Sequence, residues 1–328
     1  MLKMIAKYNF CTIITSSHYH LASVLSHSLE LQQLEFKLFV LVVDDFEQIT
    51  IKNNDINFIN IKTIIDFPYV SLMSSKYDLD FQSDNLRWSL KPVFLKYCIQ
   101  TFSNDFIFLD SDIFILNDYR FLFDILTSQK FILSPHFRDL SPSTDELNFN
   151  KNYTEGMFNG GFIGASRHSL DILDWWITVC LHCCIINKKL GYYVDQKYLD
   201  MIPVRFDNVH ILRHKGCNIA SWNINDCKRT KIGNDIIINN QFPIIFIHFT
   251  RDTCEQIIFG SDNILRPLLN KYADCIDRYN PSISFISSIK EVHEKKVKEY
   301  YKELQKKSFL KRGINSFVTT IKNSLSNN

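Results

Sequence analysis

The chain has 328 residues, of which 46% are hydrophobic and 22% charged, and its formal net charge is +2. A chain of this length and composition can bury one large core or two smaller ones. Its 27 Phe and 14 Tyr against only 9 Gly disfavour fibrous, repeat and disordered proteins. The small net charge gives no sign of a nucleic-acid-binding protein.

The nine cysteines are odd in number and unevenly spaced. This pattern favours buried, reduced thiols over a disulfide framework and predicts a cytoplasmic protein. The segment Cys180–Cys184 invites a zinc hypothesis, but Cys217 and Cys227 lack the short spacing of a second ligand pair, so we expect core thiols on an apolar helix. No secretion signal is evident after Met1–Phe10, and the longest apolar helix candidate, Ile172–Ile186, is too short to span a bilayer.

The first part of the chain predicts a strand, a helix and a second strand. The β-branched run Phe10–Thr15 is followed by two serines, either of which can cap a helix, and Lys37–Val43 is the second strand. This order predicts a parallel sheet covered by helices, in which ligands bind at the carboxyl ends of the strands. We therefore expect a nucleotide to contact Thr15, Ser16 and His20.

The rest of the chain alternates between further strands and helices. A polar loop over Ser71–Ser83 leads into a helix at Asn85–Thr101, which precedes the apolar run Phe106–Leu116. Other strands are predicted at Phe58–Ile61, Phe131–Ser134, Phe158–Ala165, Val209–Leu212 and Ile244–His248, and other helices at Leu170–Ile186 and Leu265–Tyr279. The expected fold class is α/β, with a Rossmann-like, mixed but mostly parallel central sheet flanked by helices.

The apolar run Phe106–Leu116 is interrupted only by Asp110, Ser111 and Asp112. Two carboxylates at the exit of a buried strand supply hard oxygen ligands, with which a divalent cation can bridge to a diphosphate. An aspartate-rich turn is the alternative. Two uncompensated carboxylates between buried segments are costly, however, which favours a cation site with Ser111 beside the bound nucleotide.

Four further segments occur in order around this run: Leu86–Pro92, Met157–Gly164, Asp195–Leu199 and Phe246–Thr250. Together with the aspartates they resemble the GT-A-fold glycosyltransferases, in particular the family 8-like enzymes of bacterial surface-polysaccharide (lipopolysaccharide and capsule) synthesis. The resemblance covers roughly residues 8–255. It implies the GT-A fold and a nucleotide-sugar donor.

The resemblance implies one set of residues around the donor phosphates. Asp110, Asp112 and His248 are the implied metal ligands, and Lys91 faces the phosphates. A cation and a lysine are the groups that stabilise charge on a departing diphosphate, where protonation does not help at neutral pH. Two carboxylates and an imidazole suit Mn²⁺, with Mg²⁺ as the alternative.

A second implied set surrounds the sugar. Asn159 lines the donor sugar, and Gly160 and Gly161 let the backbone approach it closely. Asp195 and Gln196 are implied to lie near the reacting carbon.

Each segment taken alone has an ordinary structural explanation. Lys91 could be a solvated lysine before a proline, His248 a core histidine, Asn159–Gly161 a plain turn and Asp195 a helix cap. The occurrence of all the segments in the family order favours the functional interpretation.

The leading hypothesis is a metal-dependent hexosyltransferase that uses a UDP-hexose and a glycan or lipid-linked acceptor, with Lys91, Asp195 and Gln196 as its catalytic residues. Two alternatives are a phosphoaspartyl-type phosphatase and a non-catalytic relative that binds glycans or nucleotides. The phosphatase needs a later acidic motif, for which Gly260–Asp262 is a poor match.

The family resemblance favours a retaining mechanism. Asp139, Asp145 or Glu146 could each serve as the base that an inverting enzyme needs.

The domain expectation is one GT-A domain at 1–285, with a nucleotide-binding half at about 8–125 and an acceptor half at about 126–285. A basic helical tail follows at 286–328. Residues 290–328 hold ten Lys or Arg against four Glu, a formal charge of +6. Peripheral contact with an anionic membrane at the inner face of the cell and a solvated terminal segment have equal weight for this tail.

Overall fold

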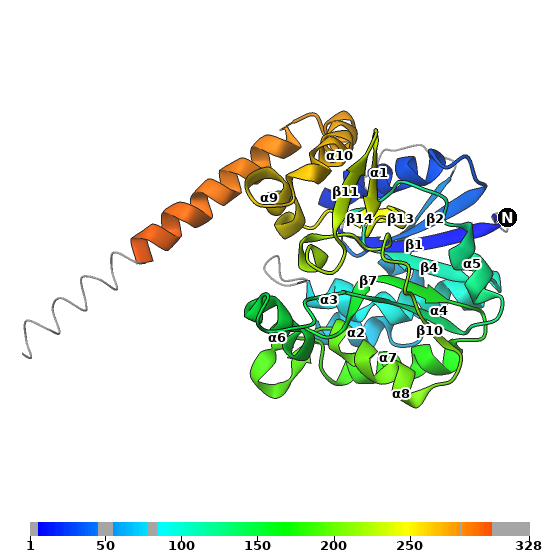
Figure 1. Ribbon diagram of the computed structural model, residues 1–328. Helices are drawn as coiled ribbons and strands as arrows, with labels where there is room; N and C mark the ends of the chain where they lie inside the picture. The colour runs from blue at the N-terminus through cyan, green and yellow to red at the C-terminus, as the bar shows by residue number, and fades with distance from the viewer. Residues whose placement is uncertain (1–5, 45–54, 78–83, 283, 304–328) are drawn as a thin grey trace, which may run out of the picture. The chain divides into compact units, whose positions relative to one another are not determined.

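The computed structural model describes residues 6–44, 55–77, 84–282 and 284–303. The chain divides into two compact units, at residues 1–280 and 281–328. The larger unit contains the central sheet (Figure 1). Every candidate site residue falls within its sequence range. In the smaller unit, residues 285–303 form a helix, and the rest of the predicted tail lies outside the described residues.

A seven-stranded mixed sheet forms the centre of the larger unit, in the order β10-β6-β7-β4-β1-β2-β3. Its strands are β1 (Tyr8–Ile14), β2 (Phe36–Val42), β3 (Ile56–Asn60), β4 (Phe106–Leu109), β6 (Phe131–Pro135), β7 (Phe158–Ala165) and β10 (Val209–Ile211). Only β7 runs against the others, since it pairs antiparallel with both β4 and β6 while the remaining pairs are parallel. The predicted α/β class with a mostly parallel sheet is confirmed.

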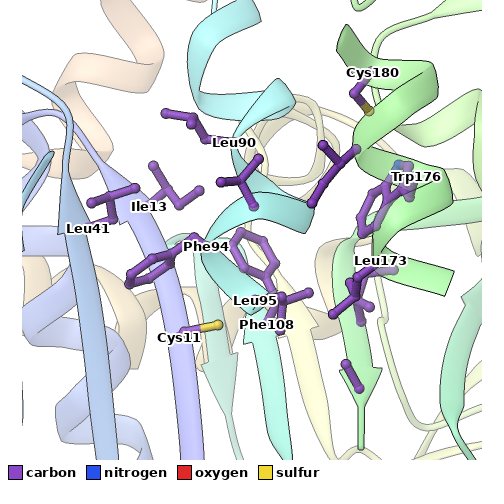
Figure 2. Close-up of a cluster of buried hydrophobic side chains, with 14 of the residues drawn as sticks. Cys11, Ile13, Leu41, Leu90, Phe94, Leu95, Phe108, Leu173, Trp176 and Cys180 are labelled. Atoms are coloured by element: carbon purple, nitrogen blue, oxygen red, sulfur yellow. The ribbon is translucent and has the colours of Figure 1, made fainter. Parts of the chain in front are cut away.

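Helices cover both faces of the sheet because alternate strand residues are apolar on both sides. Cys11 and Ile13 of β1 join one core, and Phe10 and Ile14 join the other. The first core packs against α2 (Val70–Lys76), α3 (Asn85–Ser89), α4 (Lys91–Phe102) and α7 (Leu170–His182), and part of it is shown in Figure 2. The second core packs against α1 (Tyr19–Glu30) and α5 (Arg120–Leu126).

Small elements complete the larger unit. The pair that matters for the site is β5 (Ile113–Ile115) with β14 (Phe246–His248), which are antiparallel with His248 opposite Ile113. The other strands are β8 (Ile186–Asn187), β9 (Tyr192–Tyr193), β11 (Arg229–Ile232), β12 (Asp235–Ile238) and β13 (Phe242–Pro243). The other helices are α6 (Glu146–Thr154), α8 (Ile202–Arg205), α9 (Arg251–Phe259), α10 (Arg266–Tyr279) and short 3-10 turns that include η1 (Ser16–His18), η5 (Gln196–Met201) and η6 (Ser221–Asn223).

Three predicted elements differ from the structure. The polar loop at Ser71–Ser83 was a wrong prediction in its first part, because Val70 and Met73 are fully buried on helix α2. The single helix at Asn85–Thr101 is two helices that meet at Leu90, where Pro92 sits in the first turn of α4 and lacks the N–H that a continuous helix needs. The helix from Leu170 ends at His182, four residues early.

The predicted serine cap of the first helix is also wrong. A 3-10 turn precedes α1, and neither serine side chain caps it. Ser16 instead bonds Asp44 at the end of β2, through its amide (2.6 Å) and its hydroxyl (2.9 Å). The serine therefore ties the ends of two neighbouring strands together.

All nine cysteines are free, and eight of them are buried, as predicted. Among the described residues, the one cluster of potential metal ligands is the Asp110, Asp112 and His248 group, so the cysteines form no zinc site there. No described helix combines the length and apolarity needed to cross a membrane.

Candidate active site and metal centre

The candidate residues meet at one edge of the sheet because of the strand directions. Asp110 follows β4, whose carboxyl end lies at this edge. Since β7 is antiparallel, its first residues lie at the same edge, and the Asp110 amide donates to the Gly161 carbonyl (2.8 Å). The pairing of β14 with β5 adds His248.

Asp110, Asp112 and His248 offer three ligand atoms that all lie within 4.8 Å of one another. His248 Nε2 lies 2.9 Å from Asp112 Oδ1 and 3.8 Å from Asp110 Oδ2. Burial alone would lower the pKa of His248, but the two carboxylates raise it. Burial would likewise raise the pKa of Asp112, but His248 and Lys91 hold it below its ordinary value. Two carboxylate oxygens and one imidazole nitrogen form a donor set that fits Mn²⁺.

Lys91 begins α4 and is buried beside this group. Its ammonium donates to the Gly160 carbonyl (2.9 Å) and lies 3.0 Å from Asp110 Oδ1 and 3.7 Å from Asp195 Oδ2. Burial disfavours its charge, but the two carboxylates raise its pKa. Lys91 is therefore a fixed cation between the two acidic residues, not a solvated side chain.

Asp195 is 1% exposed, and its backbone carbonyl accepts a bond from the Trp176 indole (3.1 Å). Burial raises the pKa of the Asp195 carboxyl to about 6, and Lys91 opposes this rise. Its Oδ2 has no hydrogen-bond partner in the described part of the chain. A buried carboxyl of this kind can offer negative charge to a ligand in the adjoining cavity.

Gln196, Asn159 and the two glycines form one hydrogen-bonded group. Gln196 Oε1 accepts from the Gly160 amide (3.0 Å), and Gln196 Nε2 donates to the Glu155 carbonyl (2.9 Å). Asn159 Oδ1 accepts from the Gly161 amide (3.0 Å). Gln196 thus lies against the start of β7, and Asp195 precedes it in the chain.

A cavity of about 620 Å³ joins these residues. Its lining includes Lys91, Asp110, Asp112, Asn159, Gly161, Asp195, Gln196 and His248. Beside it, a hollow of about 210 Å³ is lined by residues that include Lys91, Asp110, Ser111 and Asp112. Ser111 therefore faces this hollow rather than the main cavity.

The three N-terminal candidates line neither space. Thr15 Oγ1 bonds His18 Nδ1 (2.6 Å), Ser16 bonds Asp44, and His20 lies on α1. Their neighbour His18 lines the smaller hollow. The sequence analysis named residues at this strand end but did not single out His18.

The cavity lining also includes residues that the sequence analysis did not single out, among them His136, Arg138 and Trp222. They belong to segments that match no motif, so no local signal in the sequence indicated them. Burial lowers the pKa of His136 well below its ordinary value, so its imidazole is neutral. Arg138 is 4% exposed and paired with Glu155 (2.8 Å).

Of the three candidate bases, only Asp145 lines the cavity. Asp145 lines the cavity, but its Oδ1 accepts from the Asn148 amide (3.0 Å) as the N-cap of α6. Asp139 is buried and accepts two bonds from Asn225 (2.9 and 3.1 Å). Glu146 is exposed and, like Asp139, lies outside the cavity lining.

Comparison with solved structures identifies the fold. The galactosyltransferase LgtC, in complex with donor and acceptor sugar analogs, matches with a TM-score of 0.52 and 14% identity over 82% of this chain and 95% of LgtC. The bifunctional glycosyltransferase WbbM matches with a TM-score of 0.54 and 11% identity over 88% of this chain and 52% of WbbM. The chain has the GT-A glycosyltransferase fold, as the sequence predicted.

Two sequence relatives come from Bacillus subtilis (strain 168). The uncharacterized protein YfnD is 26% identical over 250 residues, which are 74% of this chain and 77% of YfnD. The uncharacterized protein YfnF is 26% identical over 253 residues, 74% of this chain and 80% of YfnF. No family model matches the sequence.

Proposed function

We propose that this protein is a metal-dependent glycosyltransferase that transfers a hexose from a UDP-hexose to a glycan or lipid-linked acceptor in bacterial surface-polysaccharide synthesis. The observation that carries the proposal is the convergence of Asp110, Asp112 and His248 beside Lys91 and Asp195, at the edge of one cavity. The GT-A fold supports it.

The metal ligands and Lys91 act on the leaving group. A divalent cation held by Asp110, Asp112 and His248 would offset negative charge on the departing diphosphate. Lys91 adds a second positive charge whose position is already fixed by the Gly160 carbonyl and Asp110. Fixed charges need no reorganisation during the reaction, so they stabilise the transition state more than solvated ones do.

Asp195 and Gln196 act on the sugar. As the bond to phosphate stretches, positive charge develops at the anomeric carbon, and the ionised Asp195 carboxylate stabilises it electrostatically. Gln196 fixes the start of β7, so that Asn159 and the glycines present a rigid surface to the sugar. Retention needs no protein base, because the leaving phosphate can accept the acceptor's proton. The hydrogen bonds that occupy Asp139 and Asp145 favour this outcome.

The phosphatase alternative has less support. It needs a second acidic motif, and Asp262 of the candidate segment is buried in an ion pair with Arg229 (3.1 Å) outside the cavity lining. The non-catalytic alternative predicts that a metal ligand is lost, and all three are present.

Release of UDP from a panel of UDP-hexoses with Mn²⁺ tests the proposal. Asp112→Asn should lower the rate more than about a hundredfold, because it removes the negative charge of a metal ligand without changing side-chain size. Asp226→Asn is the matched control, since Asp226 pairs with Lys215 (2.6 Å) away from the cavity. NMR of the first-formed sugar anomer distinguishes retention from inversion. Undiminished release in excess chelator would contradict the metal assignment.

A further inference from the structure

Three aromatic rings stand side by side on the wall of the cavity. The Trp222 ring lies 5.4 Å from the His248 ring and 5.3 Å from the His136 ring, centroid to centroid, and is nearly perpendicular to both (89° and 84°). All three residues line the cavity. Trp222 therefore contacts both the proposed metal ligand and the neutral His136.

The His248 ring lacks the support that metal-binding histidines usually have. Such a histidine normally donates its second ring N–H to a carboxylate or a carbonyl, and this bond fixes the orientation of the ring. His248 Nδ1 is buried and has no hydrogen-bond partner among the residues that the structure describes. Before a metal binds, the ring is therefore oriented by its contacts with Asp110, Asp112 and Trp222.

The turn η6, which carries Trp222, is firmly attached to its surroundings. Arg229 donates to the Ala220 carbonyl (2.7 Å) and the Asn223 carbonyl (2.9 Å), and its buried guanidinium pairs with Asp262 (3.1 Å). The Asn148 side chain donates to the Trp222 carbonyl (3.0 Å). These four contacts hold the turn, and with it the Trp222 backbone, in one position.

The same segment is in register with the strand that carries His248. The Ile219 amide donates to the Phe246 carbonyl (3.1 Å), and the His248 amide donates to the Ile219 carbonyl (2.9 Å). Trp222 and His248 thus belong to one rigid arrangement of backbone. Their ring contact is set by the fold and does not depend on a flexible loop.

We propose that Trp222 is a positioning residue that holds the His248 imidazole in the orientation needed for metal binding, in place of the usual hydrogen bond. This inference rests on the metal centre of the proposed function. It makes Trp222 a determinant of metal affinity although the indole supplies no ligand atom. A phenyl ring at this position keeps an aromatic contact with His248, whereas an aliphatic side chain does not.

Mn²⁺ binding to the full chain, followed by electron paramagnetic resonance with UDP present, tests the inference directly. Trp222→Leu should lower Mn²⁺ affinity about tenfold, the effect expected when the support of a metal ligand is lost. Trp222→Phe should keep most of the affinity. Trp175→Leu is the control, because it removes an indole that packs on Phe206 (5.9 Å) and not on the cavity.

Two further readouts separate positioning from a general effect on folding. UDP release by Trp222→Leu should recover towards the wild-type rate as Mn²⁺ is raised, since the defect lies in metal affinity. In the wild type, bound paramagnetic Mn²⁺ should quench tryptophan emission. Trp222→Phe should remove the part of this quenching that comes from the Trp222 indole. The second readout needs only the conservative variant, so it stands even if Trp222→Leu does not fold.

The outcomes distinguish this inference from the proposed function. Wild-type Mn²⁺ affinity in Trp222→Leu, or equal losses in the Leu and Phe variants, would overturn the role of Trp222 alone. Failure of the wild type to bind Mn²⁺ with UDP would overturn the metal centre and with it the proposed function.

Discussion

Gly161 shows how closely the backbone of β7 approaches the candidate metal ligands. A Cβ atom at this position would lie 2.4 Å from His248 Cε1, 2.7 Å from Asp110 Oδ2 and 2.8 Å from Asn159 Oδ1. Real Cβ atoms do not come this near to other heavy atoms, so any side chain would displace the ligands. Glycine is needed here for space and not for an unusual backbone angle.

Gly161→Ala should therefore weaken Mn²⁺ binding in the presence of UDP by at least about tenfold. Gly164→Ala on the same strand is the control, because the nearest atoms to its Cβ would be those of Ile132, at 2.9 Å, and not a candidate metal ligand. Overpacking of this kind costs about 1–3 kcal/mol of stability and leaves the site intact. Titration of both variants with Mn²⁺ in the presence of UDP measures their metal affinities. Equal affinities would contradict the role given to Gly161.

Asp195 should make stability depend on pH in a direction opposite to that of an ordinary salt-bridged carboxylate. Its pKa rises from 3.8 to about 6 on burial, so the folded protein binds this proton more tightly than the unfolded chain. The protonated Asp195 carboxyl contributes its full stabilisation at pH values below 3.8, its pKa in the unfolded chain. This stabilisation is lost as the pH rises through about 6, its pKa in the folded protein. The loss is about 3 kcal/mol by linkage.

Asp195→Asn has no such ionisation. Between about pH 4 and about pH 7, the free energy of unfolding of the wild type should therefore fall relative to that of the variant. Urea unfolding of both proteins across this range, in chelator, measures the difference. If the free energies of unfolding of the wild type and of Asp195→Asn change with pH in the same way, the Asp195 carboxyl has the same pKa in the folded and unfolded states.

The motif residues could be proposed from the sequence because each leaves a short local signal and the signals occur together in the family order. Asp110 and Asp112 interrupt an apolar run, and Gly160 and Gly161 are adjacent glycines in a chain with few of them. Trp222 has no such signal, because its importance lies in contacts with residues distant in the sequence. Residues of this kind become visible only when the fold is known.

At the scale of elements, strands were predicted better than their arrangement. Runs such as Phe131–Ser134 and Phe158–Ala165 have the apolar pattern of buried strands, and β6 and β7 lie there. The reversed direction of β7 leaves no trace in that pattern, since a strand buried on both faces looks the same in either direction. This reversal is nonetheless what brings Asn159 and Gly161 to Asp110.

Helix α6 is an element that the sequence pattern does not predict. It lies in the segment between Pro135 and Gly156 that matches no family pattern, and none of its residues is buried. Without an apolar face it has no strong helical periodicity. Two side-chain contacts hold it in place. Asp145 caps its first turn locally, and Asn148 bonds the carbonyl of Trp222, which is distant in the sequence.

At the scale of the whole molecule, charge is divided unevenly along the sequence. Residues 290–328 carry a formal charge of +6, so residues 1–289 carry −4 within a total of +2. In the described part of the tail, Val297, Tyr300 and Tyr301 are exposed apolar or aromatic side chains on the helix at 285–303. Basic residues with exposed aromatics are typical of a segment that binds an anionic membrane surface.

A chain that ends after Pro281 should therefore lose sedimentation with anionic vesicles at low salt and keep UDP release, because the proposed catalytic residues all precede the tail. Each basic residue near an anionic surface contributes about 1 kcal/mol, so a few engaged side chains give reversible attachment that salt weakens. Full-length protein in which Lys295, Lys296 and Lys298 are changed to Gln tests charge without removing the helix, and zwitterionic vesicles control for non-specific adsorption. If the full-length and shortened chains bind anionic vesicles equally, the tail has no membrane role.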